Sequence, residues 1–344
     1  MRDALKKTGV TFVTVAICLF AVASAWGDVI RVGSETIRGR ITSMTRTEVV
    51  VNMGTTPRTI SVNQIQTIEW DGEPALLKSV RAAFEVSRYE DVMSILDKIK
   101  VDDSTRPEVR QDIEFYRAAA AAHLALAGSG SIDDAGKLVA NFIINYPNNY
   151  HYWEATRLVA ELLRAKGSVD KAIEYYQLIA QAPWPEYKAQ AGAAIGWAYL
   201  EAKKMSEAEK AFDQVISLQV SGDDTPKLLA IIGKARCLIA QGQTDQAISM
   251  IQDILKRPDL VENAEVMGRA YTALGLAYRQ AGQIKQAIMA FLHVDLIYFR
   301  DAPSHIEALQ NLVQLWPQVQ HPERAAEAAR VLKEQYGREV AVTN

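Results

Sequence analysis

Cysteine is scarce in this sequence, which has two, Cys18 and Cys237, among 344 residues. Cys18 lies in an N-terminal segment that we expect to be removed, so a single cysteine would remain and no disulfide could form within the mature chain. The fold must then be held by its apolar core. Cys237 lies in an apolar stretch, residues 235–239, which indicates a buried structural thiol rather than a reactive one.

An excess of one sign of charge is also missing. The chain has 38 Lys and Arg against 41 Asp and Glu, a formal net charge of −3. A dedicated nucleic-acid-binding protein carries a strong basic excess. We therefore expect no nucleic-acid partner.

Motifs for catalysis or metal binding are absent from the sequence. The five histidines are dispersed, and none forms the His-Glu-x-x-His pair that puts two zinc ligands on one helical face. The glycine-rich residues 128–131 are followed by no Lys-Ser or Lys-Thr pair, so they predict a hairpin turn rather than a phosphate loop. We therefore expect no enzyme, no cofactor and no metal site.

The N-terminus has the three parts of a secretory signal peptide. Arg2, Lys6 and Lys7 are positive, an uncharged apolar stretch runs from residue 10 to residue 22, and Ala-Ser-Ala at 23–25 fits a cleavage site. We expect residues 1–25 to be removed and the protein to be periplasmic or secreted. The alternative is an uncleaved anchor in the inner membrane, because about 20 apolar residues suffice to span a bilayer. Contact with a membrane is expected through this segment or not at all.

Residues 26–73 read as a small β-domain. Val, Ile and Thr alternate with polar residues in five short predicted strands, at 29–32, 36–43, 48–53, 58–62 and 67–70. Five short strands bury a face by curling into a barrel, so the pattern predicts an SH3-like or Sm-like β-barrel. A barrel this small would be marginally stable alone, and we expect it to pack on the first helices.

After Pro74 the pattern becomes repetitively helical. A small apolar residue followed four positions later by another apolar residue recurs at intervals of 36 to 43 residues. This predicts about seven helical hairpins over residues 74–338, with a disordered tail at 339–344. The pairs are Val92 and Leu96, Ala135 and Val139, Ala172 and Tyr176, Ala208 and Phe212, Ala247 and Ile251, Ala287 and Phe291, and Ala325 and Ala329.

The helical part resembles the tetratricopeptide repeat family in the order of its small and aromatic residues. The resemblance implies an α+β fold, with the small N-terminal β-barrel followed by an all-α, right-handed superhelix of tetratricopeptide-like hairpins, an α-solenoid. Repeat lengths above the family's and a missing first-helix Trp mark a divergent array. The best matches are Gly196, Tyr199, Ala208 and Phe212, and Leu274, Gly275, Tyr278, Ala287 and Phe291; Gly167, Gly242 and Gly282 match the family's turns.

The same resemblance implies a concave groove lined by the first helix of each repeat. Five arginines on one wall would favour an acidic or carboxylate-bearing partner. The alternative is that these arginines are solvated or paired with neighbouring glutamates. The Asn and Lys pattern of the family's chaperone-binding carboxylate clamps is missing. The groove positions are Arg157, Glu161, Arg164, Trp197, Arg236, Arg269 and Arg279.

The Pro-Trp-Pro-Glu-Tyr segment at 183–187 is a second candidate surface. Trp184 and Tyr187 could present an exposed aromatic anchor to a partner, since these residue types dominate interface hot spots. In the alternative, Trp184 fills the space between consecutive repeats.

For function, the resemblance implies a non-enzymatic protein–protein interaction scaffold in the bacterial cell envelope, which binds proteins or peptides through the superhelix. One alternative is a peptide- or glycan-binding module of an export or cell-wall system, and another places the binding on the β-domain. An enzyme of unrecognised class would need clustered titratable groups in a cleft, and the sequence shows none.

Overall fold

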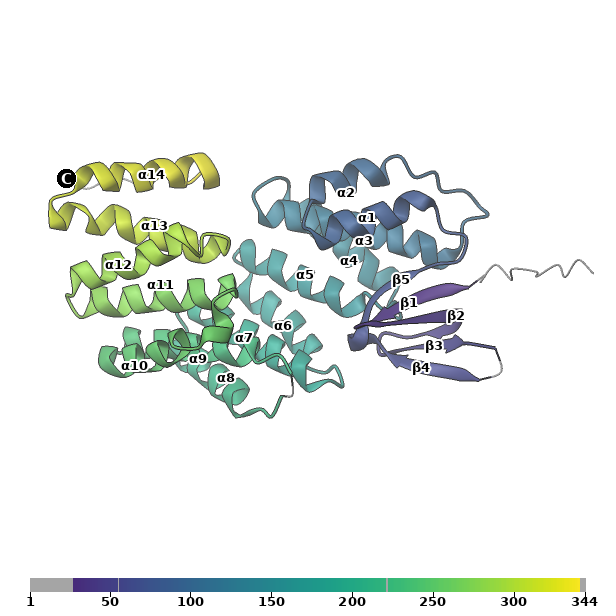
Figure 1. Ribbon diagram of the computed structural model, residues 1–344, viewed down its shortest axis with the longest axis horizontal. Helices are drawn as coiled ribbons and strands as arrows, with labels where there is room; N and C mark the ends of the chain where they lie inside the picture. The colour runs from purple at the N-terminus through teal and green to yellow at the C-terminus, as the bar shows by residue number, and fades with distance from the viewer. Residues whose placement is uncertain (1–26, 55, 221, 341–344) are drawn as a thin grey trace, which may run out of the picture.

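The computed structural model describes residues 27–54, 56–220 and 222–340, which form five strands followed by fourteen α-helices (Figure 1). The predicted signal peptide lies outside these residues. Among the described residues, no helix combines the length and apolar character needed to cross a membrane. The strands are β1 Asp28–Val32, β2 Glu35–Met44, β3 Glu48–Asn52, β4 Pro57–Ser61 and β5 Ile65–Glu69, with a 3-10 turn, η1, at Val62–Gln64.

The helices follow without another strand in the described chain. Their bounds are α1 Ala75–Glu85, α2 Tyr89–Leu96, α3 Pro107–Leu126, α4 Ile132–Asn145, α5 Tyr152–Ala165, α6 Val169–Ile179, α7 Pro185–Glu201, α8 Met205–Ser217, α9 Thr225–Ala240, α10 Thr244–Leu255, α11 Ala264–Gln280, α12 Ile284–Leu296, α13 Ala302–Leu315 and α14 Pro322–Tyr336; short 3-10 turns lie at Pro258–Leu260 and Pro317–Val319.

The five strands form an open antiparallel sheet in the order β4-β3-β2-β1-β5. No pairing joins the edge strands β4 and β5 within the described residues, so the prediction of a closed barrel is wrong. The sheet bends within β2, which pairs with β1 through residues 35–39 and with β3 through residues 40–44. Gly39 lies at the bend, where a Cβ would be 2.4 Å from the backbone oxygen of Asn52.

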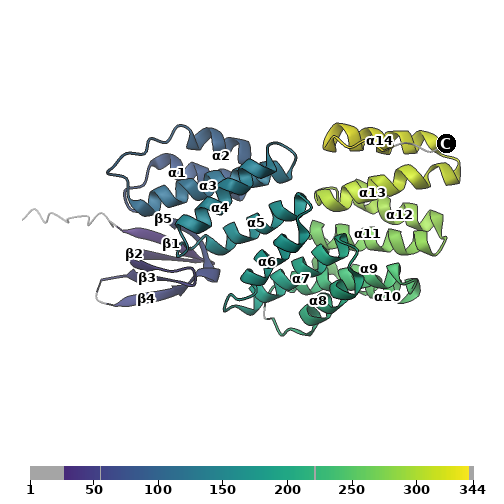
Figure 2. The same ribbon diagram turned by 180° about the vertical axis from the view of Figure 1, so that it is seen from behind.

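Helices, and not a closed barrel, cover the apolar face of the sheet. Buried sheet residues such as Ile30 and Val51 belong to one hydrophobic core with Leu77 of α1, Phe115 of α3 and Leu158 of α5. Figures 1 and 2 show the sheet beneath α1–α4 at one end of the elongated molecule and the α13–α14 hairpin at the other. The sheet therefore packs on the helices, as its small size predicts.

Three indole N–H groups fasten the sheet to three different hairpins. Trp70, just after β5, donates a 2.9 Å hydrogen bond to Asp112 of α3. Trp153 of α5 donates to the backbone carbonyl of Arg46, and Trp184, just before α7, donates to the hydroxyl of Ser61, both at 2.8 Å. These bonds fix the sheet against α3, α5 and α7.

The helices pair as seven hairpins, each made of an odd-numbered helix and the next even-numbered one. A residue with a left-handed backbone lies between the two helices of every hairpin, because this conformation ends one helix and reverses the chain. Its φ is between 58° and 90° throughout. The seven residues are Ser87, Gly128, Gly167, Lys203, Gly242, Gly282 and Gln320.

At three glycines of the hairpins, a buried aromatic ring leaves no room for a side chain. Phe212 of α8 is fully buried between Gly196 of α7 and Gly233 of α9. A Cβ on either glycine would lie 2.4 Å or less from the Phe212 ring. Gly275 of α11 stands in the same relation to Phe291 of α12, at 2.6 Å. In these hairpins the glycine therefore allows the aromatic ring to pack against the backbone of the facing helix.

Candidate functional site

Five of the seven predicted groove residues line one cavity of the helical array. The cavity has a volume of about 400 Å³ and lies between α5, α6, α7, α9 and α11. Arg236 of α9 and Arg279 of α11 lie outside it. The predicted residues that line it are Arg157, Glu161 and Arg164 of α5, Trp197 of α7 and Arg269 of α11.

The cavity also has lining residues that sequence reasoning missed. Tyr176 and Ile179 come from α6, the second helix of its hairpin, whereas the predicted groove used first helices alone. Burial raises the pKa of Tyr176 to about 12, so its hydroxyl stays protonated at neutral pH. Ala194 of α7 and Leu229 of α9 add further apolar surface. The cavity therefore combines an apolar lining with a small number of charged groups, as ligand pockets do.

Most of the groove arginines are paired within the chain. Arg157 pairs with Glu161, Arg164 with Glu201 at 3.2 Å, and Arg236 makes two hydrogen bonds to Glu307 at 2.7 and 2.8 Å. Arg279 donates to the amide oxygen of Asn311 at 2.5 Å. Glutamates therefore pair with Arg157, Arg164 and Arg236, while the partner of Arg279 is neutral.

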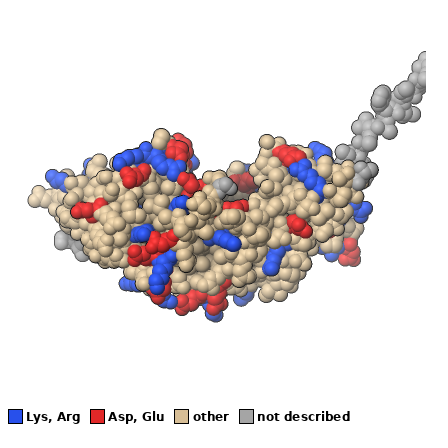
Figure 3. All heavy atoms as spheres, turned by 90° about the horizontal axis from the view of Figure 1, so that it is seen from below, with Lys and Arg blue, Asp and Glu red and all other residues tan. Residues whose placement is uncertain are grey.

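The cavity itself carries no surplus of positive charge. Its cations, Arg157, Arg164 and Arg269, face three carboxyl groups. The carboxyl groups belong to Glu161, Glu265 and Asp223. Figure 3 shows the same mixture on one face of the whole molecule, where basic and acidic side chains are interspersed. A polyanion would therefore gain little from this surface.

Trp197 lies under two arginines in this region. The guanidinium carbon of Arg269 is 4.6 Å from the centre of the Trp197 ring, and that of Arg236 is 5.6 Å away. Phe212 packs edge-on against Trp197, and their ring centres are 5.9 Å apart. Trp197 is 6% exposed, so a buried aromatic ring lies beneath both guanidinium groups.

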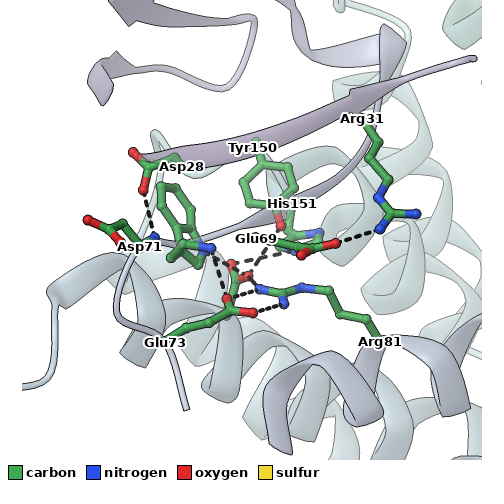
Figure 4. Close-up of polar contacts among 10 residues, drawn as sticks. Asp28, Arg31, Glu69, Asp71, Glu73, Arg81, Tyr150 and His151 are labelled. Atoms are coloured by element: carbon green, nitrogen blue, oxygen red, sulfur yellow. Dashed lines mark hydrogen bonds and ion pairs between the residues drawn. The ribbon is translucent and has the colours of Figure 1, made fainter. Parts of the chain in front are cut away.

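A second concentration of charged groups lies between the sheet and the first helices (Figure 4). Asp112 of α3 is completely buried and accepts hydrogen bonds from Trp70 and, at 3.0 Å, from Arg81 of α1. Arg81 also donates two bonds, of 2.6 and 2.8 Å, to Glu73. His151 Nε2 is 3.8 Å from Asp112, beyond hydrogen-bond distance.

This buried cluster positions the sheet rather than binding a ligand. Arg81 is 5% exposed and Asp112 is 0% exposed, so their charged groups present no open face to a substrate. Asp28 extends the polar connection, because its carboxylate accepts bonds from the backbone of Ile41 and Asp71 and from Arg106. The cluster joins β1, β5, α1 and α3.

The aromatic residues of the 183–187 segment pack against other residues of the same chain. Trp184 and Tyr187 are both partly buried, and their ring centres are 4.9 Å apart. Tyr187 also lies edge-on to Trp153 of α5, at 6.5 Å, and burial raises the pKa of its hydroxyl to about 12. The pair fills the space between α5, α7 and the sheet.

Cys237 and His305 are both held within the packed interior. Cys237 is buried in α9, and burial raises the pKa of its thiol to about 11. His305 of α13 is held between Asp295 and Tyr336 at 2.9 and 2.7 Å. No group of three or more His, Cys, Asp or Glu side chains in the described part of the chain is placed to hold a metal ion.

Comparison with known proteins addresses the helical part. Residues 120–187 and 232–294 match one model of the tetratricopeptide repeat family, and residues 189–219 match another. No protein with a curated function matches the sequence.

Two solved structures share the fold at low sequence identity. A tetratricopeptide repeat protein from Parabacteroides merdae is 13% identical, with a TM-score of 0.54 over 76% of this chain and 92% of that chain. A Rap protein complexed with Competence and Sporulation Factor is 11% identical, with a TM-score of 0.52 over 76% of this chain and 75% of that one.

Proposed function

Because the chain is a tetratricopeptide repeat protein with a small N-terminal five-stranded sheet, we propose that it is a non-enzymatic scaffold that binds peptide segments of partner proteins. The segments lie along the inner helices α5, α7, α9 and α11. Repeats of this family typically mediate protein–protein binding, and their large curved surface suits extended partners.

The cavity at Trp197 is the observation that carries this proposal. Its volume of about 400 Å³ is within the range of ligand pockets, and it admits a few side chains rather than a folded domain. Its apolar lining offers burial to a side chain, while Arg157, Glu161 and Glu265 offer polar groups to a peptide backbone. The Rap protein of similar fold is complexed with Competence and Sporulation Factor, which supports a partner that binds to the array.

The cell-envelope location is part of the same proposal and rests on the sequence pattern of residues 1–25. Fusion of this segment to a reporter that folds only after export tests it. Reporter activity supports the location, and its absence contradicts it.

Peptide binding is tested by selecting peptides from a random dodecapeptide library on the purified protein. We expect peptides whose binding is lost when Ala194→Phe fills the cavity. The control is Ala82→Phe, at an exposed position of α1, which adds the same ring outside the groove. If the recovered peptides bind both variants equally, the groove is not the binding site; if none binds the unaltered protein, the proposed function is wrong.

A further inference from the structure

The side chain of Arg269 makes no hydrogen bond to a described residue, whereas that of each of the other groove arginines makes at least one. A guanidinium has five N–H donors. The one ion pair that Arg269 forms with a described residue joins its Nη2 to Glu265 Oε1 at 3.3 Å. Its Nε is buried and has no acceptor among the described residues. Arg236, which stacks on the same indole, instead gives two short hydrogen bonds to Glu307.

The setting of Arg269 makes the unused Nε–H costly. Its side chain is 16% exposed, so little water replaces the missing acceptors. A buried N–H donor without an acceptor destabilises the folded protein, and more so when the group is charged. The guanidinium carbon lies 4.6 Å from the centre of the Trp197 ring, and both residues form the wall of the cavity. Arg269 is therefore desolvated, oriented and incompletely paired before any ligand arrives.

We infer that the cavity recognises one carboxylate of the bound peptide and that Arg269, stacked on Trp197, is the residue that holds it. The inference rests on the proposed function and adds the chemistry of the ligand. A carboxylate matches the planar fork of an arginine and accepts two N–H bonds from it. The apolar surface from Ile179, Ala194 and Leu229 then receives a neighbouring side chain of the peptide.

The acidic residues of the cavity limit the ligand to a single negative charge. Glu265, Glu161 and Asp223 line the same space, and they repel a phosphate dianion or an acidic run more than one carboxylate. Glu265 also competes with the ligand for Arg269. Replacing Glu265 by the neutral isostere glutamine removes this competitor and leaves the shape of the cavity unchanged.

The test uses peptides recovered from the random dodecapeptide library that bind the unaltered protein and not Ala194→Phe. Each peptide is remade with one carboxylate neutralised at a time, by Asp→Asn, Glu→Gln or a C-terminal amide. We expect one of these changes to weaken binding at least about tenfold, the ratio that a hydrogen bond to a charged group supplies. With Arg269→Gln, the parent and neutralised peptides should bind equally.

Two further variants separate recognition from folding. Arg324→Gln is the matched control, because Arg324 of α14 also lies over an indole, that of Trp316, at 5.1 Å but outside the cavity. It should keep the full preference for the carboxylate. Glu265→Gln should strengthen binding of the parent peptides severalfold. Peptides that bind with no carboxylate preference, or a preference that persists in Arg269→Gln, would overturn the inference and leave peptide binding intact.

Discussion

Phe212 fills the place that a side chain on Gly233 would occupy: a Cβ built there lies 2.2 Å from the Cζ atom of the ring. Phe212 is completely buried, so its ring has no free space to enter. The glycine is thus required by the contact between α8 and α9.

Gly233→Ala should therefore destabilise the protein although alanine favours helix formation. Overpacking a core costs about 1–3 kcal/mol, and the gain in helix propensity offsets up to about 1 kcal/mol of it. Chemical denaturation measures the difference. Gly136→Ala in α4 is the control, because no atom lies within 4 Å of a Cβ there, and it should stabilise by about 0.5–1 kcal/mol. Equal stability of the two variants would contradict the packing role.

Replacing Lys203 by glycine should stabilise the protein. Lys203 has a left-handed φ of 59°, and its side chain is exposed in the turn between α7 and α8. Four other hairpins have glycine at the left-handed turn residue. A non-glycine residue in this conformation costs about 1–2 kcal/mol, part of which glycine loses again to chain entropy. We expect Lys203→Gly to raise the unfolding free energy by about 0.5–1 kcal/mol.

The same substitution inside a helix provides the contrast. Lys210 is exposed in α8, where glycine costs about 1 kcal/mol. Lys210→Gly should accordingly lower the melting temperature. If Lys203→Gly lowers it as much, the left-handed turn is not strained.

Asp112→Ala should be among the most damaging single changes. It removes the acceptor of both Arg81 and Trp70 in a fully buried site, and breaking one side of a buried ion pair costs about 3–5 kcal/mol. A lower denaturation midpoint, together with a change in the fluorescence of Trp70, would show the effect. Asp97→Ala, which removes an exposed pair with Arg117, should change stability by less than about 1 kcal/mol.

Cys237 should be unreactive in the folded protein. Because burial raises the pKa of the thiol to about 11, almost no thiolate is present at pH 8, and alkylating reagents should label it after unfolding. The stabilising effect of the neutral thiol is complete below the ordinary cysteine pKa of about 8.5 and is lost as the pH rises toward 11. The control is Cys237→Ala, in which this part of the alkaline loss of stability should be absent. Rapid labelling of the native protein at pH 8 would contradict the assignment.

The local features of this fold could be predicted from the sequence, but its long-range pairings could not. Gly275 and Phe291 could be matched to the repeat pattern because each repeat is one local hairpin. The groove positions followed from the same register, and five of them line the cavity. The bond between Arg236 and Glu307 spans 71 residues, and no local pattern indicates which carboxylate an arginine meets.

The open sheet shows the same limit. Alternating apolar residues correctly located the strands, but strand pattern alone cannot tell whether an edge strand or a helix covers the apolar face. In the structure, Trp153 and Trp184 hydrogen-bond to Arg46 and Ser61 and so join helices to the sheet. The sequence identifies them only as aromatic residues of distant helices and does not indicate these partners.

Those two tryptophans also set an order of events during synthesis. Arg46 precedes Trp153 by 107 residues, and Ser61 precedes Trp184 by 123. The strands leave the ribosome first, yet half of the chain must be translated before their last anchor emerges. At about 5–20 residues per second, the nascent sheet waits for about 5 to 25 seconds with its apolar face incompletely covered. This interval is when a chaperone would find its binding site on the growing chain.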